Sequence, residues 1–352
     1  MIAGGQSGQI RIVNLSTGNC VHMIDSHIDE NNCQHVNKLC VKQNSLILGG
    51  NPWIRVISMS KLEGGQILHG HTRNVTCIDI EEDKGIWFVS GSEDGYIRIW
   101  DLRAKGYQTS WKHTCGIASG EIHPNMGAFI FGDSNGSLSE WDLTANKCST
   151  KHVEALGRIG LGVHAICIDK RRQNIICAHH NRLVSAYGIF YPSDTNNEMM
   201  MQENTPTSVN INTDDRNMPQ TFGSDIHQSS YITNLNIGKS SDSIAITSGD
   251  GAVSIWRDNL GTWTLDNVMK DSSSSSTITK WAWDAKFIDN DERFVLSAHS
   301  DGICNLWDTA RHVPTPIASY ECGGGKNVQS ITIVHTSDLK TGVIDRRHRV
   351  GK

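Results

Sequence analysis

One short segment of the chain has the spacing of a catalytic serine. Gly132, Ser134 and Gly136 match the G-x-S-x-G motif, in which a serine nucleophile sits on a sharp turn between a strand and a helix. Here the same residues fall on a turn that recurs along the chain between two strands, and a motif carries weight only in its proper structural context. We therefore interpret the segment as a structural turn.

Histidines and cysteines are frequent enough to raise the question of a metal site. The closest approaches, Cys33 with His35 and His179 with His180, lack a second pair at the spacing of zinc ligands. The glycines within 157–162 are in the wrong order for a dinucleotide-binding fingerprint. We therefore expect no metal, no cofactor, no small-molecule substrate and no catalysis.

A repeated pattern must position these side chains. Each copy begins with an Asp, Asn or Ser, which is usually followed by Gly. Six residues later an apolar residue ends a strand of alternating polar and apolar residues. The clearest copy contains Asp94, Gly95 and Trp100. The strand-ending residues are Val13, Ile57, Trp100, Trp141, Tyr187, Trp256 and Trp307. Most of their spacings lie near the ~40–45 residues of a four-stranded propeller blade. The pattern predicts an all-β, seven-bladed β-propeller.

The domain boundaries follow from this repeat. We predict a single propeller over 1–340, in which a turn and one strand, Gln9–Val13, share the closing blade with the C-terminal segment Val328–His335. Two longer intervals have visible causes in composition: a polar, disordered insertion over 192–225 and a Ser-rich loop over 270–278. A basic tail occupies 341–352.

A histidine stands at a near-constant distance before several of the strand-ending residues. His27, His71, His113 and His227 precede them by 30, 29, 28 and 29 positions. In the clearest copy, His71, Ser90 (or Ser92), Asp94 and Trp100 resemble the hydrogen-bonded tetrad of the WD-repeat family. Such a network satisfies buried polar groups and fixes strand register.

The bulk properties exclude several classes of protein. The net charge is −5 and the isoelectric point is near 6.3, so general nucleic-acid binding is disfavoured. No apolar run reaches the length of a membrane span, and the N-terminus lacks the pattern of a secretion signal. Ten scattered cysteines without CxxC pairs indicate reduced thiols and a cytoplasmic location.

A pair of tryptophans stands at the start of the last full blade. Trp281 and Trp283 are separated by one residue, so they point to the same side of a strand. They are either core packing or the rigid anchors of a protein interface. Aligning the other blades predicts a ring of residues that face the same surface: His35 and Asn37, Asn74 and Thr76, Gly116 and Ala118, Gly162 and His164, Tyr231 and Thr233. Little charge on this ring favours a protein partner.

Particular stretches resemble the G-protein-β-subunit-like family of small propeller subunits of the TOR kinase complexes. They are HVNKLCV with GGNPWIRV, GHTRNVTCIDI with SGSEDGYIRIWDLR, EIHPNMGAFIFGDSNGSLSEWDLTANKC, and WAWDAKF with HSDGICNLWD. The resemblance runs through nearly the whole chain. Its most specific points are the turn Gly50–Arg55 and the segment Trp281–Asp284.

The resemblance implies a subunit without catalysis of its own, which docks on an insertion in the C-terminal lobe of the TOR kinase and supports its activity in TORC1 and TORC2. It also implies that Trp281 and Trp283 contact the kinase. From their place on or beside the predicted ring, further partner-binding candidates are Asp284, Tyr231, Asn74, Asn37 and His164. Blade five, the 192–225 insertion and Gly116–Gly120 depart from the family pattern.

Two other functions fit the same fold. A generic scaffold or ubiquitin-ligase substrate receptor is possible because fold does not settle partner choice. A receptor of that kind would show paired W-D-x-R motifs, and only Trp100–Arg103 qualifies. A propeller enzyme would need convergent carboxylates or metal ligands in the central channel, and the strand-ending positions supply none.

Overall fold

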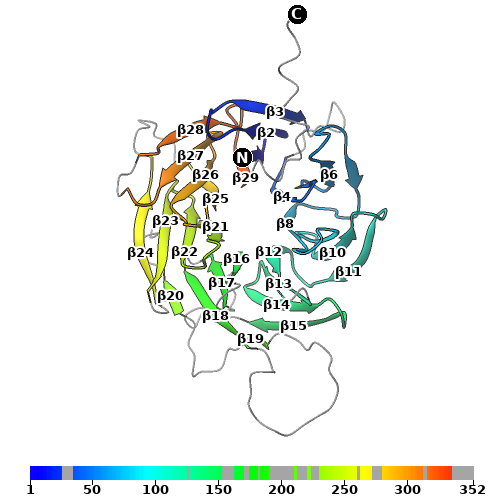
Figure 1. The fold of residues 1–352 in the computed structure, drawn as a ribbon. Coiled ribbons are helices and arrows are strands. Elements are labelled where there is room, and N and C mark those ends of the chain that lie inside the picture. The colour runs from blue at the N-terminus through cyan, green and yellow to red at the C-terminus, as the bar shows by residue number, and fades with distance from the viewer. Residues whose placement is uncertain are drawn as a thin grey trace, which may run out of the picture.

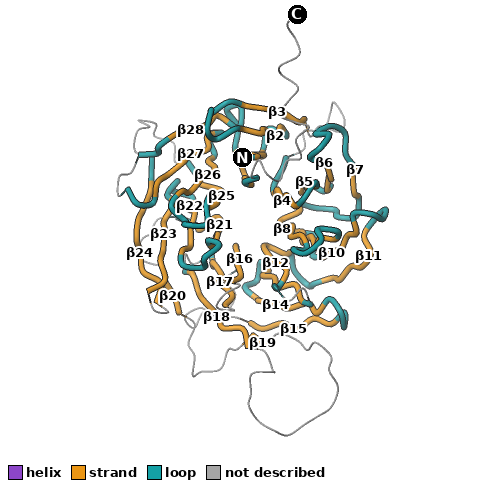
Figure 2. Tube along the Cα trace, viewed as in Figure 1, coloured by secondary structure: helices purple, strands orange, loops and turns teal. Residues whose placement is uncertain are grey.

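The structure is a computed structural model, and it describes residues 1–25, 35–124, 127–152, 162–169, 174–180, 183–190, 210–211, 220–222, 230–259, 262–271, 280–311 and 315–334. These residues form seven antiparallel sheets arranged as blades around a central axis (Figure 1). The described stretches contain strands and loops but no helix (Figure 2). The predicted all-β, seven-bladed propeller is confirmed.

Each blade has four strand positions between the central axis and the rim. The innermost strands are β29 (Val328–Thr332), β4 (Lys38–Lys42), β8 (Val75–Ile80), β12 (Ile117–Ile122), β16 (Val163–Asp169), β21 (Ile232–Ile237) and β25 (Ala282–Phe287). The second strands are β1 (Ile2–Gly5), β5 (Ser45–Gly49), β9 (Trp87–Ser92), β13 (Ala128–Asp133), β17 (Asn174–His179), β22 (Ser243–Ser248) and β26 (Phe294–His299).

The third strands carry the residues that revealed the repeat. They are β2 (Gln9–Val13), β6 (Ile54–Ser58), β10 (Tyr96–Asp101), β14 (Ser137–Asp142), β18 (Val184–Phe190), β23 (Val253–Asn259) and β27 (Ile303–Asp308). The outer strands are β3 (Cys20–Asp25), β7 (Gln66–Leu68), β11 (Tyr107–Lys112), β15 (Lys147–His152), β19 (Asn210–Ile211) with β20 (Gln220–Phe222), β24 (Thr262–Met269) and β28 (Ala318–Glu321).

The recurring turn joins the second strand of a blade to the third. Gly95 and Gly136 adopt positive φ angles of 80° and 90° in two of these hairpins, a conformation that a side chain would strain. Asp94 fixes its turn by accepting a hydrogen bond from the Tyr96 amide at 2.9 Å. The turn is therefore structural, and Gly132–Gly136 lies in one such hairpin rather than in a strand-to-helix elbow.

The N- and C-terminal parts of the chain share blade one. Ala3 of β1 pairs with Ile331 of β29, so the ring is closed by antiparallel hydrogen bonds. The expectation of a single N-terminal strand was wrong, because β1 and β3 flank Gln9–Val13 on both sides. The period-two signal of β1 is hidden because all four of its residues are buried. The C-terminal strand ends at Thr332, earlier than expected.

Part of the predicted insertion belongs to a blade. Within 192–225 the structure describes β19 and β20, and both pair with β18 as the outer edge of blade five. The prediction of disorder was therefore wrong for these short strands. The remainder of that range, nearly all of the Ser-rich loop and the basic tail lie outside the described residues.

The hydrophobic core lies between adjacent blades rather than at the centre of the ring. The cluster between blades three and four joins Cys77, Val89 and Ile97 to Phe129 and Trp141. Burying a large apolar side chain contributes about 1.5–3 kcal/mol, so each interface between blades is a substantial source of stability. Among the described residues there is no helix with the length and hydropathy needed to cross a membrane.

Candidate functional site

An irregularity in the innermost strands builds the candidate site. In β8 the pairing with β9 skips from Val75 to Cys77, so Thr76 is the extra residue of a β-bulge. The same skip occurs in the innermost strands of blades one, four, five, six and seven. A bulge turns its extra residue out of the ladder. The sequence thus presents one side chain from nearly every blade at the mouth of the channel.

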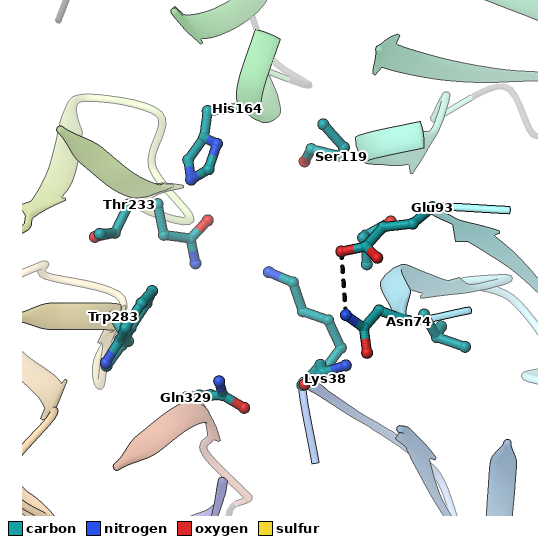
Figure 3. A pocket seen from close by; sticks show the side chains of 13 residues that line it. Lys38, Asn74, Glu93, Ser119, His164, Thr233, Trp283 and Gln329 are labelled. Carbon is teal, nitrogen blue, oxygen red and sulfur yellow. Dashed lines mark hydrogen bonds between the residues drawn. The ribbon is translucent and has the colours of Figure 1, made fainter. Parts of the chain in front are cut away.

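These bulge residues surround a cavity of about 260 Å³ (Figure 3). Its wall is formed by Asn37, Lys38, Asn74, Val75, Thr76, Glu93, Ala118, Ser119, His164, Thr233, Asn234, Trp283 and Gln329. We define the channel-mouth surface as the ring Asn37, Thr76, Ala118, His164, Thr233, Trp283 and Gln329, together with Trp281 and Tyr231 beside it. Each of the seven blades contributes one residue to that ring.

Most of the predicted ring residues meet at this cavity. Those that line it are Asn37, Asn74, Thr76, Ala118, His164, Thr233 and Trp283. His35, Gly116, Gly162 and Tyr231 belong to the same alignment but do not line it. His35 instead bonds through Nδ1 to the Gln6 carbonyl at 2.8 Å. Tyr231 is 55% exposed and lies next to His180, with ring centroids 6.5 Å apart.

The two tryptophans contact each other at the edge of the cavity. The ring centroids of Trp281 and Trp283 are 5.0 Å apart with an interplanar angle of 30°. Only Trp283 lines the cavity. Two groups of the channel-mouth surface, Trp283 Nε1 and Gln329 Oε1, are buried without a hydrogen-bond partner among the described residues. Buried polar groups are normally paired, so these two groups are exceptions within the channel-mouth surface.

Asp284 has a structural position, which corrects its assignment as a partner-binding residue. It is only 2% exposed, and its carboxylate accepts hydrogen bonds from Asn234 Nδ2 at 2.7 Å and from the Ile331 amide at 3.0 Å. These donors belong to blades six and one, so Asp284 ties three consecutive blades together. A carboxylate buried and held in this way stabilises the ring rather than forming part of its exposed surface.

Similar bonds connect other neighbouring blades around the axis. The Leu39 amide donates to Ser330 Oγ at 3.1 Å, and the Ile122 amide donates to Asp79 Oδ2 at 2.8 Å. The Ile168 amide donates to Glu121 Oε2 at 2.9 Å. The innermost strands are therefore held in a fixed arrangement, and so are the bulge residues that they carry.

Charged groups also gather on the innermost strands, although the strand-ending residues did not predict them. The enclosed position of Glu121, with the Asp79 carboxylate nearby, raises the pKa of Glu121 to about 7, while Lys286 and Lys38 oppose the shift. These four residues come from blades two, three, four and seven. The hub thus contains acids, although both carboxylates also hold backbone amides of the next blade.

Histidines give the channel mouth a polar side near blade five. The rings of His164 and His180 are 5.2 Å apart in a T-shaped arrangement. Burial lowers the pKa of His164, and the neighbouring His180 ring and Lys38 side chain lower it further. On the opposite side Glu93 accepts a hydrogen bond from Asn74 Nδ2 at 3.1 Å, and Lys38 extends toward the middle of the opening (Figure 3).

Blade three contains the full hydrogen-bonded tetrad. His71 Nδ1 lies 3.0 Å from Asp94 Oδ2 and His71 Nε2 lies 2.7 Å from Ser90 Oγ, which also accepts a bond from Trp100 Nε1 at 2.8 Å. Burial lowers the pKa of His71. Burial opposes ionisation of Asp94, but the bonds from His71 and the Thr72 amide outweigh it and lower the pKa of Asp94.

Blade four has a changed version of this network. His113 Nε2 bonds to Asp133 Oδ2 at 2.8 Å, an aspartate at the end of the second strand rather than in the turn. Trp141 Nε1 donates to Asn146 Oδ1 at 3.0 Å. Blade seven also differs, because Trp307 donates to Ser297 at 2.7 Å and His299 of the same strand completes the contact. His27 and His227 lie outside the described residues.

Several residues that line the cavity were not predicted from the sequence. Gln329 is the bulge residue of β29, and aligning Val328–Thr332 with the innermost strands of the other blades finds it. Lys38, Ser119 and Asn234 each follow a ring residue directly on an innermost strand, and Glu93 lies in the turn after β9. The place of Glu93 at the cavity depends on the course of that turn, which periodicity does not report.

Comparison with known proteins agrees with this structure. A family profile described as "WD domain, G-beta repeat" matches residues 64–101, which cover the tetrad of blade three. Two solved structures share the fold: the Cps50 (Swd1) β-propeller domain of Myceliophteria thermophila, with a TM-score of 0.61 at 12% identity over 84% of this chain and 88% of that one, and a chain of a mitotic checkpoint complex, with 0.65 at 15% over 87% and 86%.

Sequence relatives carry a more specific name. The chain is 33% identical over 42% of its length to "Target of rapamycin complex subunit wat1" of Schizosaccharomyces pombe, of which the match covers 47%. It is 24% identical to "Protein LST8 homolog" of Drosophila melanogaster over 81% of both chains. The best-matching part spans about half the length of the first relative. The chain is thus a seven-bladed propeller in which residues 64–101 match the "WD domain, G-beta repeat" profile, and it is similar in sequence to subunits of target of rapamycin complexes.

Proposed function

We propose that this propeller is a non-catalytic subunit of a TOR kinase complex in the cytoplasm, which binds the kinase domain through the channel-mouth surface and supports its activity. The observation that carries the proposal is the convergence of seven blades on one cavity bordered by two contacting tryptophans. The names of two sequence relatives, both subunits of target of rapamycin complexes, support this choice of partner.

The chemistry of the surface suits a protein segment. Aromatic anchors at the centre of an interface contribute most of the binding energy, while surrounding polar groups exclude water and set orientation. Trp283 and Trp281 fit the first role, and the amides of Asn37, Asn74 and Gln329 fit the second. An insertion in the C-terminal lobe of the kinase is the segment that we expect to occupy the cavity.

The rigidity of the channel-mouth surface also favours binding. The bulge residues lie on strands that are tied to neighbouring blades by buried hydrogen bonds, including those accepted by Asp284 and Ser330. A surface that is ordered before binding loses little conformational entropy on association. The propeller therefore supports the kinase by binding its insertion on a rigid surface.

Affinity purification of the tagged full-length chain, followed by mass spectrometry, tests this proposal. We expect wild-type chain to recover a TOR kinase, and the double substitution Trp281→Ala with Trp283→Ala to reduce recovery at least about tenfold. Tyr107→Ala is the matched control, because Tyr107 is a 44% exposed aromatic on the outer strand of blade three. That variant should recover the kinase normally.

A second surface variant separates binding from folding. Tyr231→Asp changes a 55% exposed side chain at the channel mouth, so it should weaken kinase recovery without lowering the melting temperature of the chain. Undiminished recovery in both the double tryptophan variant and Tyr231→Asp would reject the assigned surface. Recovery of ubiquitin-ligase subunits in place of a kinase would favour the alternative of a substrate receptor.

A further inference from the structure

The rewired network of blade four leaves an unusual set of side chains in one place. One ring nitrogen of His113, the sulfur of Cys115 and a carboxylate oxygen of Asp133 all lie within 4.8 Å of one another. His113 is 7% exposed and Asp133 is 2% exposed, while Cys115 is half-buried. Nitrogen, sulfur and oxygen donors together are a combination that zinc accepts.

The matched position in blade three shows why this set is specific to blade four. There His71 uses both ring nitrogens, one with Asp94 and one with Ser90. In blade four the place of Ser90 in the strand register is taken by Phe131, which offers no oxygen. Nε2 of His113 bonds to Asp133, and Nδ1 has no hydrogen-bond partner among the described residues. Nδ1 can therefore take the ring proton and leave Nε2, which faces Asp133, free to bind an ion.

The surroundings hold these donors in place. The His113 ring packs against Trp111 and Phe131, with centroid distances of 5.4 and 5.3 Å. Asp133 Oδ1 accepts bonds from the Asn135 and Ser137 amides at 2.9 and 2.8 Å, which orient the carboxylate. Such outer contacts are typical of metal ligands. Cys115 lies toward solvent beside exposed Asn135, whose Nδ2 is 2.8 Å from Sγ, so an ion has a route of entry.

We propose that His113, Cys115 and Asp133 form a zinc site on the same face as the channel mouth, with water as the fourth ligand. Ligands of a tetrahedral zinc ion are roughly 3.3–3.7 Å apart, so the His113–Asp133 pair must open by roughly half an ångström. On binding, Cys115 releases its thiol proton to solvent, and His113 binds through Nε2, whose proton moves to Nδ1 by way of solvent. This proposal does not depend on the partner of the propeller.

Titration of the untagged, metal-free full-length chain with Co²⁺, a spectroscopic substitute for zinc, tests the site. We expect one equivalent to bind with a thiolate-to-cobalt charge-transfer band, and one equivalent of Zn²⁺ to displace it. Cys115→Ser should remove the band and weaken binding at least about tenfold. Cys20→Ser, which changes an exposed cysteine on the outer strand of blade one, should have no effect.

Two further measurements keep the result interpretable. The melting temperatures of metal-free wild type and Cys115→Ser should agree, and Zn²⁺ should raise only that of the wild type. If Cys115→Ser is unstable, Asp133→Asn gives a second variant that retains an oxygen for the Asn135 amide. Absence of the charge-transfer band in the wild type, or its loss with Cys33→Ser instead of Cys115→Ser, would overturn the proposal.

Discussion

Blades three and four have a histidine and a tryptophan at matching positions, but these side chains form different hydrogen bonds in the two blades. Each has a histidine before its first strand and a tryptophan at the end of its third, as His71 with Trp100 and His113 with Trp141. In blade three the hydroxyl of Ser90 bonds both of them. In blade four Phe131 stands at that position, and the two side chains find separate partners.

The difference shows that one small residue decides whether the network is closed. When the serine is present, each polar atom of His71 and Trp100 is satisfied inside the blade. When it is absent, packing of Phe131 replaces part of the lost stabilisation, and the histidine keeps an unused nitrogen. A closed network gives stability, whereas an open one leaves groups that can bind a ligand.

The largest effect is expected from removing the shared hydroxyl of blade three. Ser90→Ala leaves the buried Trp100 Nε1 without an acceptor and His71 Nε2 without its partner, which should cost about 3 kcal/mol of unfolding free energy. Urea denaturation measures this value. Ser16→Ala, at an exposed serine, should stay within about 0.5 kcal/mol. A comparably small change in Ser90→Ala would show that packing alone holds the blade.

The second effect concerns the acids of the innermost strands, Asp79 in blade three and Glu121 in blade four. The folded pKa of Glu121, about 7, is above its unfolded value of 4.5, so its contribution to stability is complete below pH 4.5 and is lost as the pH rises through 7. The pKa shift alone corresponds to roughly 3 kcal/mol of unfolding free energy. Because Glu121 keeps some contact with solvent, we expect the unfolding free energy to fall by roughly 2 kcal/mol.

Unfolding free energies of the wild type and Glu121→Gln between pH 5 and pH 8 test this assignment. The wild type should lose stability over this range, and Glu121→Gln should lose less because an amide does not ionise. Glu63→Gln, at an exposed glutamate, controls for the change in net charge. If wild type and Glu121→Gln show the same pH dependence, the carboxylate of Glu121 does not cause the loss of stability.

The smallest effect is expected in blade four. Asn146 accepts the bond from Trp141 and has a positive φ of 52°, which asparagine and aspartate tolerate better than alanine. Asn146→Ala should therefore cost about 1 kcal/mol, less than Ser90→Ala, because the asparagine is exposed. Asn146→Asp keeps an oxygen and the same backbone preference, so its melting temperature should be closer to that of the wild type. Equal losses in the two variants would exclude the hydrogen bond as the cause.

The fold could be predicted because its signal is repeated and local. A turn, a strand and an apolar residue at a fixed distance appear in each blade, and errors in one copy are corrected by the others. The prediction failed where a strand is buried throughout, as in Ile2–Gly5, or lies far along the chain from its neighbours, as in Gln220–Phe222. Neither strand alternates in a way that periodicity detects.

The site could be predicted only in part, for a physical reason. Asn37, Thr76, His164, Thr233 and Trp283 were found because they occupy one repeated position. The β-bulge that turns all of them except Asn37 toward the cavity has no marker in composition. Asp284 was misassigned because burial of a charged side chain depends on donors from two other blades, which the sequence around it does not contain.

The central claim is that the kinase binds the channel-mouth surface, and site-specific photo-crosslinking tests this claim most directly. A photoreactive amino acid placed at Thr76 or Thr233, on the ring, is compared with one at Gln108, on the outer strand of blade three. We predict covalent adducts with the kinase from the two ring positions and none from Gln108. Adducts from Gln108 alone would contradict the proposed docking surface.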